Sequence, residues 1–162
     1  AVLPALAVVG ILLGPLVVES ARRARAVVSA RGTPVRLDLY RRTSEWIRGY
    51  TAEDRVVATL EIGGLGFYSN RPIHDLLALV SPAALPAVHR GDLAAAFHAG
   101  KPDLFVVYSP HRSLLQPILD DPDFQVDFCP VTRLAAKKGT PSVTVYGRRP
   151  RPATTPCVNL RD

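Results

Sequence analysis

The sequence predicts an α/β fold: a small mixed-sheet domain with flanking helices and a C-terminal β-hairpin, preceded by one transmembrane helix. Three observations lead to this prediction. Short apolar, β-branched runs alternate with helical patterns, two alternating segments near the end flank a Gly-Pro loop, and residues 1–18 carry no polar side chain. They divide the chain into a transmembrane helix (1–20), a basic juxtamembrane segment (21–34), an α/β domain (35–149) and an irregular tail (150–162).

The apolar run 1–18 ends at Glu19. As a helix it would span about 27 Å, just short of the roughly 30 Å hydrocarbon core, so a few upstream residues would complete a crossing. Because the chain starts without Met, we expect such upstream sequence. A cleaved signal peptide is one alternative, but the basic n-region is absent. A buried core helix is the other, and Pro4 and Pro15 would weaken it in water.

The α/β domain is expected to begin with a helix over 35–49, because Leu37, Tyr40, Ser44 and Ile47 fall at helical spacing. Trp46 lies beside this buried stripe. Strands are then expected at 56–61 and 65–69, with the glycines between them supplying the freedom for a tight bend. A turn at 70–72 leads to Asp75.

Short helices are expected at 82–89 and 92–99, the second with Asp92 as N-cap and Gly100 as its stop. The uninterrupted apolar run 104–108 is typical of a strand covered on both faces. With 56–61 it would form the centre of the sheet.

The last part of the domain is expected to contain a short helix over 113–119, then a turn at 120–123. Residues 124–133 and 142–148 alternate apolar and polar side chains, which predicts the hairpin. Cys129 lies at its start and Cys157 in the tail. Outside the cytoplasm this pair could form a disulfide, and two unpaired thiols are the equal alternative.

The net charge of +6 is concentrated after the apolar run, where arginines dominate residues 19–48. Such a segment favours an anionic surface, and membrane lipid headgroups or a lipid-linked phosphate are the partners that fit best. Nucleic acid is not expected, since no recognised fold motif or stacking aromatics accompany the arginines. Arginine enrichment from a GC-rich coding sequence is the alternative explanation.

The sequence contains few motifs that would support catalysis or cofactor binding within this chain. The run Gly63-Gly64-Leu65-Gly66 is not a dinucleotide fingerprint, and neither a phosphate loop nor a nucleophile elbow is present. The histidines lack metal-ligand spacing, so no metal site is expected and each is assigned to the surface or a loop. Glu61 and Asp75 could pair for acid/base work, although capping of backbone amides is the stronger expectation. In an α/β sheet, active-site groups gather at strand carboxyl ends, here Glu61 and residues 109–112.

Several motifs resemble a known family. They are YRRTSEWIRGYTAEDR (40–55), Glu61-Ile62-Gly63, Gly66-Phe67-Tyr68, Asp75, Leu79-Val80-Ser81-Pro82, and Lys101-Pro102-Asp103 before the apolar run. Over residues 36–149 the chain resembles the C-terminal soluble domain of bacterial C-superfamily glycosyltransferases, many-spanning membrane enzymes that use polyprenyl-phosphate sugars. One departure is Ala78, where the family usually has Gly.

The resemblance implies an accessory domain that faces outward from the cell membrane and is inactive alone. The parent enzyme would transfer a sugar from a polyprenyl-phosphate donor to an extracytoplasmic acceptor, with a metal-assisted acid in a loop this chain does not contain. Catalytic residues are therefore expected outside this chain, and no cofactor within it. Substrate-binding or structural candidates are Glu61, Tyr68, Asp75, Arg41 and Arg42.

Two points stay open at this stage. Basic residues just after a crossing favour the cytoplasmic side, but one helix of a many-spanning protein does not fix its orientation. A membrane-anchored binding or scaffold domain without an enzyme is the alternative function. A soluble nucleotide-binding protein would need a phosphate loop that the sequence lacks.

Overall fold

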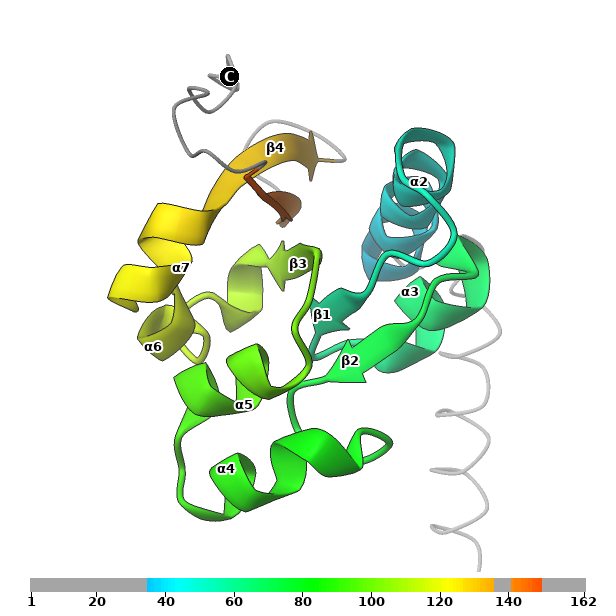
Figure 1. Cartoon of the computed structure of the whole chain (residues 1–162). Coiled ribbons are helices and arrows are strands. Elements are labelled where there is room, and N and C mark those ends of the chain that lie inside the picture. Colours follow the sequence, from blue (N-terminus) through cyan, green and yellow to red (C-terminus); the bar gives the residue numbers. More distant parts are fainter. Residues whose placement is uncertain (1–34, 136–140, 150–162) are drawn as a thin grey trace, which may run out of the picture. The chain divides into compact units, whose positions relative to one another are not determined.

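A five-stranded mixed sheet lies between two groups of helices in the computed structural model, which describes residues 35–135 and 141–149 (Figure 1). The described elements, in chain order, are α2 (Val35–Tyr50), β1 (Val57–Thr59), α3 (Ile62–Ser69), β2 (Ile73–Asp75), the 3₁₀ turn η1 (Pro82–Ala84), α4 (Leu85–His89), α5 (Leu93–Ala99), β3 (Leu104–Tyr108), the 3₁₀ turn η2 (Ser109–His111), α6 (Gln116–Leu119), α7 (Pro122–Asp127), β4 (Phe128–Ala135) and β5 (Ser142–Arg148).

The strand order is β2-β1-β3-β5-β4. Strand β1 pairs in parallel with both β2 and β3, whereas β5 pairs antiparallel with both β3 and β4. The predicted α/β class, the mixed sheet and the C-terminal hairpin are confirmed, and β1 and β3 occupy interior positions as expected.

Both faces of the sheet are covered, and side chains alternate between them along each strand. Val57 and Val106 pack with Leu39, Ile47 and other residues of α2 and α3 on one face. Ala58, Phe105 and Val107 pack on the other face against the aromatic side chains of α5 and α7. Figure 1 shows α2 and α3 on one side of the sheet and α4 to α7 on the other. Burial on both faces explains why 104–108 has no polar residue.

The predicted strand at 65–69 is wrong, because these residues belong to helix α3. This helix lies against α2, and it turns Leu65 and Ser69, four residues apart, into the core. At position 64 an added Cβ atom would lie 3.4 Å from the ring of Tyr40, which is ordinary van der Waals contact, so the two helices pack closely at this position. The glycines serve helix packing here and do not form the predicted bend.

The predicted strand over 124–133 starts too early. Residues up to Asp127 form α7, since the Asp121 carboxylate accepts a hydrogen bond from the Phe124 amide and Pro122 occupies the first helical turn. Strand β4 then runs with a register shift between Pro130 and Thr132. The expected helix over 113–119 is shorter, because α6 covers only its second half.

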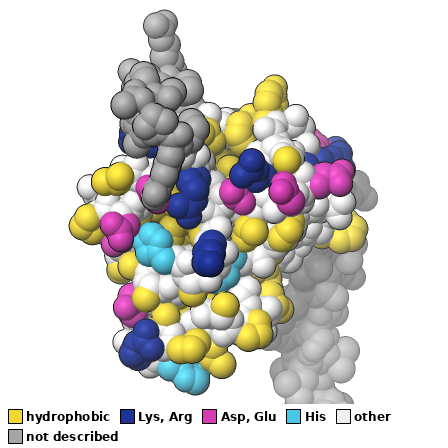
Figure 2. Space-filling model, in the orientation of Figure 1, with side chains coloured by type: hydrophobic (Ala, Val, Ile, Leu, Met, Phe, Trp, Pro, Cys, Tyr) yellow, Lys and Arg dark blue, Asp and Glu magenta, His cyan; other side chains and the backbone are white. Residues whose placement is uncertain are grey.

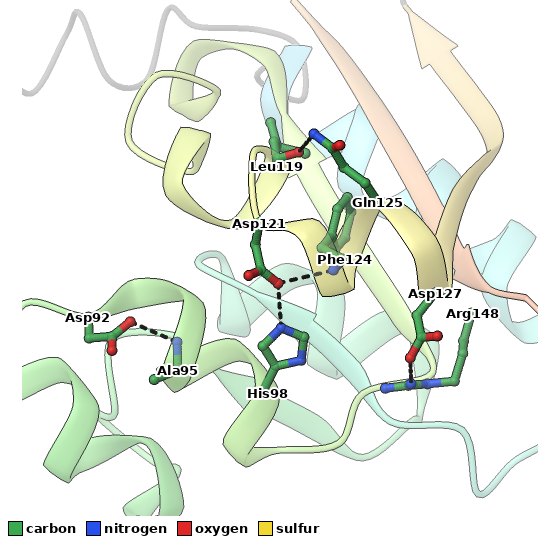
Figure 3. A network of polar contacts seen from close by, with 9 residues as sticks. All are labelled: Asp92, Ala95, His98, Leu119, Asp121, Phe124, Gln125, Asp127 and Arg148. Atoms are coloured by element: carbon green, nitrogen blue, oxygen red, sulfur yellow. Dashed lines mark hydrogen bonds and ion pairs between the residues drawn. The ribbon is translucent and has the colours of Figure 1, made fainter.

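A polar network joins the helices on the second face (Figure 3). The Asp121 carboxylate that caps α7 also lies 2.7 Å from Nε2 of His98 on α5. Asp92 caps α5 as predicted, by accepting a hydrogen bond from the Ala95 amide. The assignment of all histidines to the surface or loops is wrong for His74, which is 4% exposed and donates a hydrogen bond to the Ala96 carbonyl at 2.7 Å.

The predicted transmembrane helix (1–20), basic segment (21–34) and tail (150–162) lie outside the described residues. None of the helices within 35–135 and 141–149 combines the length and the apolar character that a membrane crossing requires.

Candidate functional site

The carboxyl ends of β1 and β3 lie side by side where the chain leaves the sheet in opposite directions. After β1 the chain enters α3 on one face, and after β3 it reaches α6 on the other, as Leu65 and Ile118 in separate cores demonstrate. Such a switch point is where open α/β sheets usually bind ligands. Glu61 lies there, as predicted.

Glu61 faces two basic side chains at this edge. Its Oε1 lies 3.7 Å from Nη1 of Arg36 on α2 and 3.7 Å from Nε2 of His111 on η2. The Glu61 amide also donates a hydrogen bond to Oγ1 of Thr59. A carboxylate beside an imidazole can exchange a proton, so these groups have the composition of a general acid/base pair.

Tyr40 lies beneath this pair, and its side chain is 3% exposed. Burial, followed by the negative charge of Glu61, raises the pKa of the Tyr40 hydroxyl well above its usual value. No group among the described residues meets hydrogen-bond geometry with this hydroxyl, Glu61 included. The Tyr40 ring contacts Tyr108 edge to face, with centroids 5.5 Å apart, and Tyr108 in turn contacts His111.

The space enclosed at this edge does not admit a water-sized sphere, although the Glu61 side chain itself is 26% exposed. A general acid/base pair needs room for a substrate atom within hydrogen-bond reach. The Glu61 cluster, defined as Arg36, Tyr40, Glu61, Tyr108 and His111, therefore encloses no substrate cavity.

Asp75, the second predicted acid, is fully buried at the end of β2. Its carboxylate accepts hydrogen bonds from the amides of Leu77 at 2.9 Å and Val80 at 3.0 Å. The Asp75 amide donates to Oγ of Ser81 at 2.8 Å. Asp75 thus caps backbone amides, as expected, but those of the loop after β2 and not those of the glycine segment, which is helical.

The other predicted site residues lie on the outer surface of α2 and α3. Arg41 pairs with Glu45 at 2.9 Å, and Arg42 lies 3.9 Å from Asp38 and donates a hydrogen bond to the Ala135 carbonyl. Tyr68 is half-buried and contacts Phe67. Figure 2 shows that basic and acidic side chains are interspersed on one face of the molecule, with Lys and Arg next to Asp and Glu. None of these contacts involves Glu61 or Asp75.

The predicted disulfide is outside what the structure describes. Cys129 lies half-buried on β4, while Cys157 belongs to the residues beyond 149. Within 35–135 and 141–149, no three His, Cys, Asp or Glu side chains converge as metal ligands.

An open cleft lies at the opposite end of the sheet, next to the amino ends of β1 and β3. Its volume is about 480 Å³, and its main lining side chains are Trp46, Tyr50, Arg55, Asp103, Arg148 and Arg149. We refer to it as the arginine cleft. Sequence reasoning missed it, although Trp46 and Tyr50 are four residues apart on a helix and Arg55 follows closely.

The walls of the arginine cleft are fixed by ion pairs. Asp103 accepts hydrogen bonds from the Arg55 guanidinium and the Val56 amide, both at 2.9 Å. Arg148 pairs with Asp127 at 2.9 Å (Figure 3), and its guanidinium lies 4.8 Å from the centre of the Phe128 ring.

A domain of unknown function (DUF8728) matches residues 28–146. The chain belongs to the DUF8728 family. Searches of curated proteins and of solved structures gave no match. The DUF8728 match spans α2 to the greater part of β5, and it includes both the Glu61 cluster and most of the arginine cleft.

Proposed function

We propose that this chain is a non-catalytic accessory domain of an integral-membrane glycosyltransferase that uses a polyprenyl-phosphate sugar donor. The domain would face the extracytoplasmic side of the cell membrane and bind or position the acceptor. Membrane lipid and, through the parent enzyme, the lipid-linked sugar would be its partners, and any divalent metal would belong to the parent. The resemblance over residues 36–149 and the apolar run 1–18 support this assignment.

One structural observation supports the proposed accessory role. The edge of the sheet where chemistry is expected encloses no cavity at Glu61, whereas an open cleft lies at the other end. A sheet edge without a cavity is suited to a structural role and not to catalysis. An open cleft lined by aromatic and basic side chains is suited to ligand binding.

The same cleft also favours a second function, a membrane-anchored binding domain with no enzyme attached. The coding sequence upstream of Ala1 separates the two proposals. Eight or more predicted membrane helices upstream support the enzyme, and a start codon just before Ala1 supports the anchored module.

The direct test measures sugar transfer from a radiolabelled polyprenyl-phosphate sugar in membranes that contain the parent protein. We expect transfer by the parent, none by this chain alone, and a loss of at least tenfold when residues 35–149 are deleted. Undiminished transfer after the deletion, with membrane insertion verified by detergent size exclusion, would rule out an accessory role.

Point variants refine this test. Glu61→Ala and Asp75→Ala, combined in the parent, address the predicted site residues directly. Because Asp75 caps the Leu77 and Val80 amides, the combination is expected to lower stability. Transfer that is unchanged at a temperature where the domain stays folded would assign both residues a purely structural role.

A further inference from the structure

We propose that the arginine cleft binds a small anion that carries a ring, of the class of sugar acids and sugar phosphates. The inference rests on the proposed binding role of the domain, for which it supplies a ligand class. It does not depend on an attached enzyme, so the two proposals can fail separately.

Arg149 supplies the anion site. Its Nε is buried and has no hydrogen-bond partner among the described residues. Arg149 also lines the cleft, and the other N–H groups of its guanidinium can donate to a carboxylate or phosphate oxygen there. The planar guanidinium matches both groups in a two-point hydrogen bond.

The neighbouring arginines are already engaged but add positive potential. Arg55 is paired with Asp103, and Arg148 with Asp127. Since Asp103 also holds the Val56 amide, the wall on that side is fixed before a ligand arrives. Binding to a preorganised cleft loses less conformational entropy than binding to a mobile one.

The ring site is formed by Trp46 and Tyr50. Their rings stack with centroids 5.2 Å apart at an angle of 22°, and Tyr50 is 75% exposed. An exposed aromatic stack gives a rigid apolar surface beside polar groups, which suits the apolar face of a ligand ring. The cleft volume of about 480 Å³ falls within the range of small-molecule sites, roughly 300–1,000 Å³.

The chain contains its own reporter of this site. Trp46 is the single tryptophan among the 162 residues, so intrinsic tryptophan fluorescence reports on the cleft alone. The experiment titrates the full chain, in a detergent without a sugar headgroup, with methyl glucuronide, glucose 6-phosphate and AMP. Methyl glucoside, which has the ring but no charge, and inorganic phosphate, which has the charge but no ring, serve as matching half-ligands that each carry one of the two features.

We expect saturable quenching by at least one of the three ring anions, with at least tenfold weaker binding of both half-ligands. Added salt should weaken the binding, because the anion interacts with charged arginines. A response to the glucuronide or the sugar phosphate identifies a carbohydrate source. A response to AMP alone identifies a nucleotide as the ligand that combines a ring with an anionic group.

Four variants give matched comparisons. Arg149→Gln should weaken ring-anion binding at least tenfold, whereas Arg90→Gln, at the exposed arginine that follows α4, should leave it unchanged. Tyr50→Ala should weaken it at least threefold, whereas Phe67→Ala, at another highly exposed aromatic residue, should not. Far-UV circular dichroism verifies that each variant is folded.

Absence of saturable quenching by all three ring anions would overturn the proposal, and so would full binding by folded Arg149→Gln. If the cleft fails this test while deletion of 35–149 still abolishes sugar transfer, the accessory role stands without this ligand. If the cleft binds and the parent transfers no sugar, the ligand class stands without the enzyme.

Discussion

The buried ring of His74 occupies the space that a side chain at position 100 would require. His74 lies on β2, and Gly100 follows the last turn of α5, so their contact fixes the distance between a strand and a helix terminus. The hydrogen bond from Nε2 of His74 to the Ala96 carbonyl reinforces this contact.

Gly100→Ala should therefore destabilise the domain by about 1–3 kcal/mol, because the added methyl group collides with a ring that is held in place. Gly49→Ala is the matched control. Position 49 lies on α2 with nothing within 4 Å of the added atom, so alanine should be neutral or stabilise by up to about 1 kcal/mol. Thermal unfolding followed by circular dichroism measures both, and equal midpoints for the two variants would contradict the proposed contact.

Ala78 offers a stabilising substitution. It adopts a φ of 59°, a left-handed conformation that costs an alanine about 1 kcal/mol and a glycine almost nothing. Ala78→Gly should raise the free energy of unfolding by up to about 1 kcal/mol, measured by urea denaturation, and a clear loss would show that the loop does not hold this conformation in solution.

Tyr40→Phe should leave stability unchanged or raise it by up to about 1 kcal/mol at neutral pH. The substitution removes a buried hydroxyl that has no hydrogen-bond partner among the described residues, while it keeps the ring. Urea denaturation at pH 7 measures the difference. A loss above 2 kcal/mol would show that the hydroxyl is bonded in solution.

The same residue predicts a pH dependence. Burial and the charge of Glu61 raise the pKa of folded Tyr40 above its ordinary value of 10.0. Above pH 10 the unfolded chain therefore binds fewer protons than the folded one, so this contribution to stability is complete below pH 10 and falls as pH rises. Between pH 9 and pH 11 the wild-type chain should lose more stability than Tyr40→Phe. Parallel losses in the two proteins would contradict the raised pKa.

Asp121 and Asp92 both cap helices, and their alanine variants form a matched pair (Figure 3). Asp92→Ala should cost about 1 kcal/mol, the usual loss for an N-cap. Asp121→Ala should cost more, about 2 kcal/mol, because it also removes the hydrogen-bond partner of His98. Thermal unfolding compares them, and adding His98→Ala to Asp121→Ala should cost less than His98→Ala alone if the two groups interact.

Much of the fold could be predicted from local patterns. The helix beginning at Val35 follows from apolar residues at helical spacing, the Asp92 cap from a residue type that accepts amide hydrogen bonds, and β3 from an apolar run covered on both faces. In each case one segment of sequence contains the physical cause.

Helix α3 could not be predicted in this way. Its three glycines lower the intrinsic helix propensity, and its apolar run is so short that its pattern does not distinguish a helix from a strand. What makes it helical is contact with α2, where position 64 approaches Tyr40. That contact joins residues distant in sequence and is therefore absent from any local pattern.

The candidate sites were likewise predicted only in part from the sequence. Sequence reasoning expected Glu61 at a strand carboxyl end, and it lies two residues beyond the end of β1. It placed residues 109–112, which include His111, at the same edge as Glu61, but it missed the arginine cleft, whose walls come from α2, the segments before β1 and β3, and the end of β5.

The sequence alone determined the α/β class, the hairpin and the Asp92 cap, because these depend on periodicity and on hydrogen bonds within a few residues. Tertiary structure alone decided that the edge at Glu61 encloses no cavity and that a cleft lies between Tyr50 and Arg149. Both features depend on how side chains from separate segments fill a shared volume, and that quantity exists only after the segments have packed together.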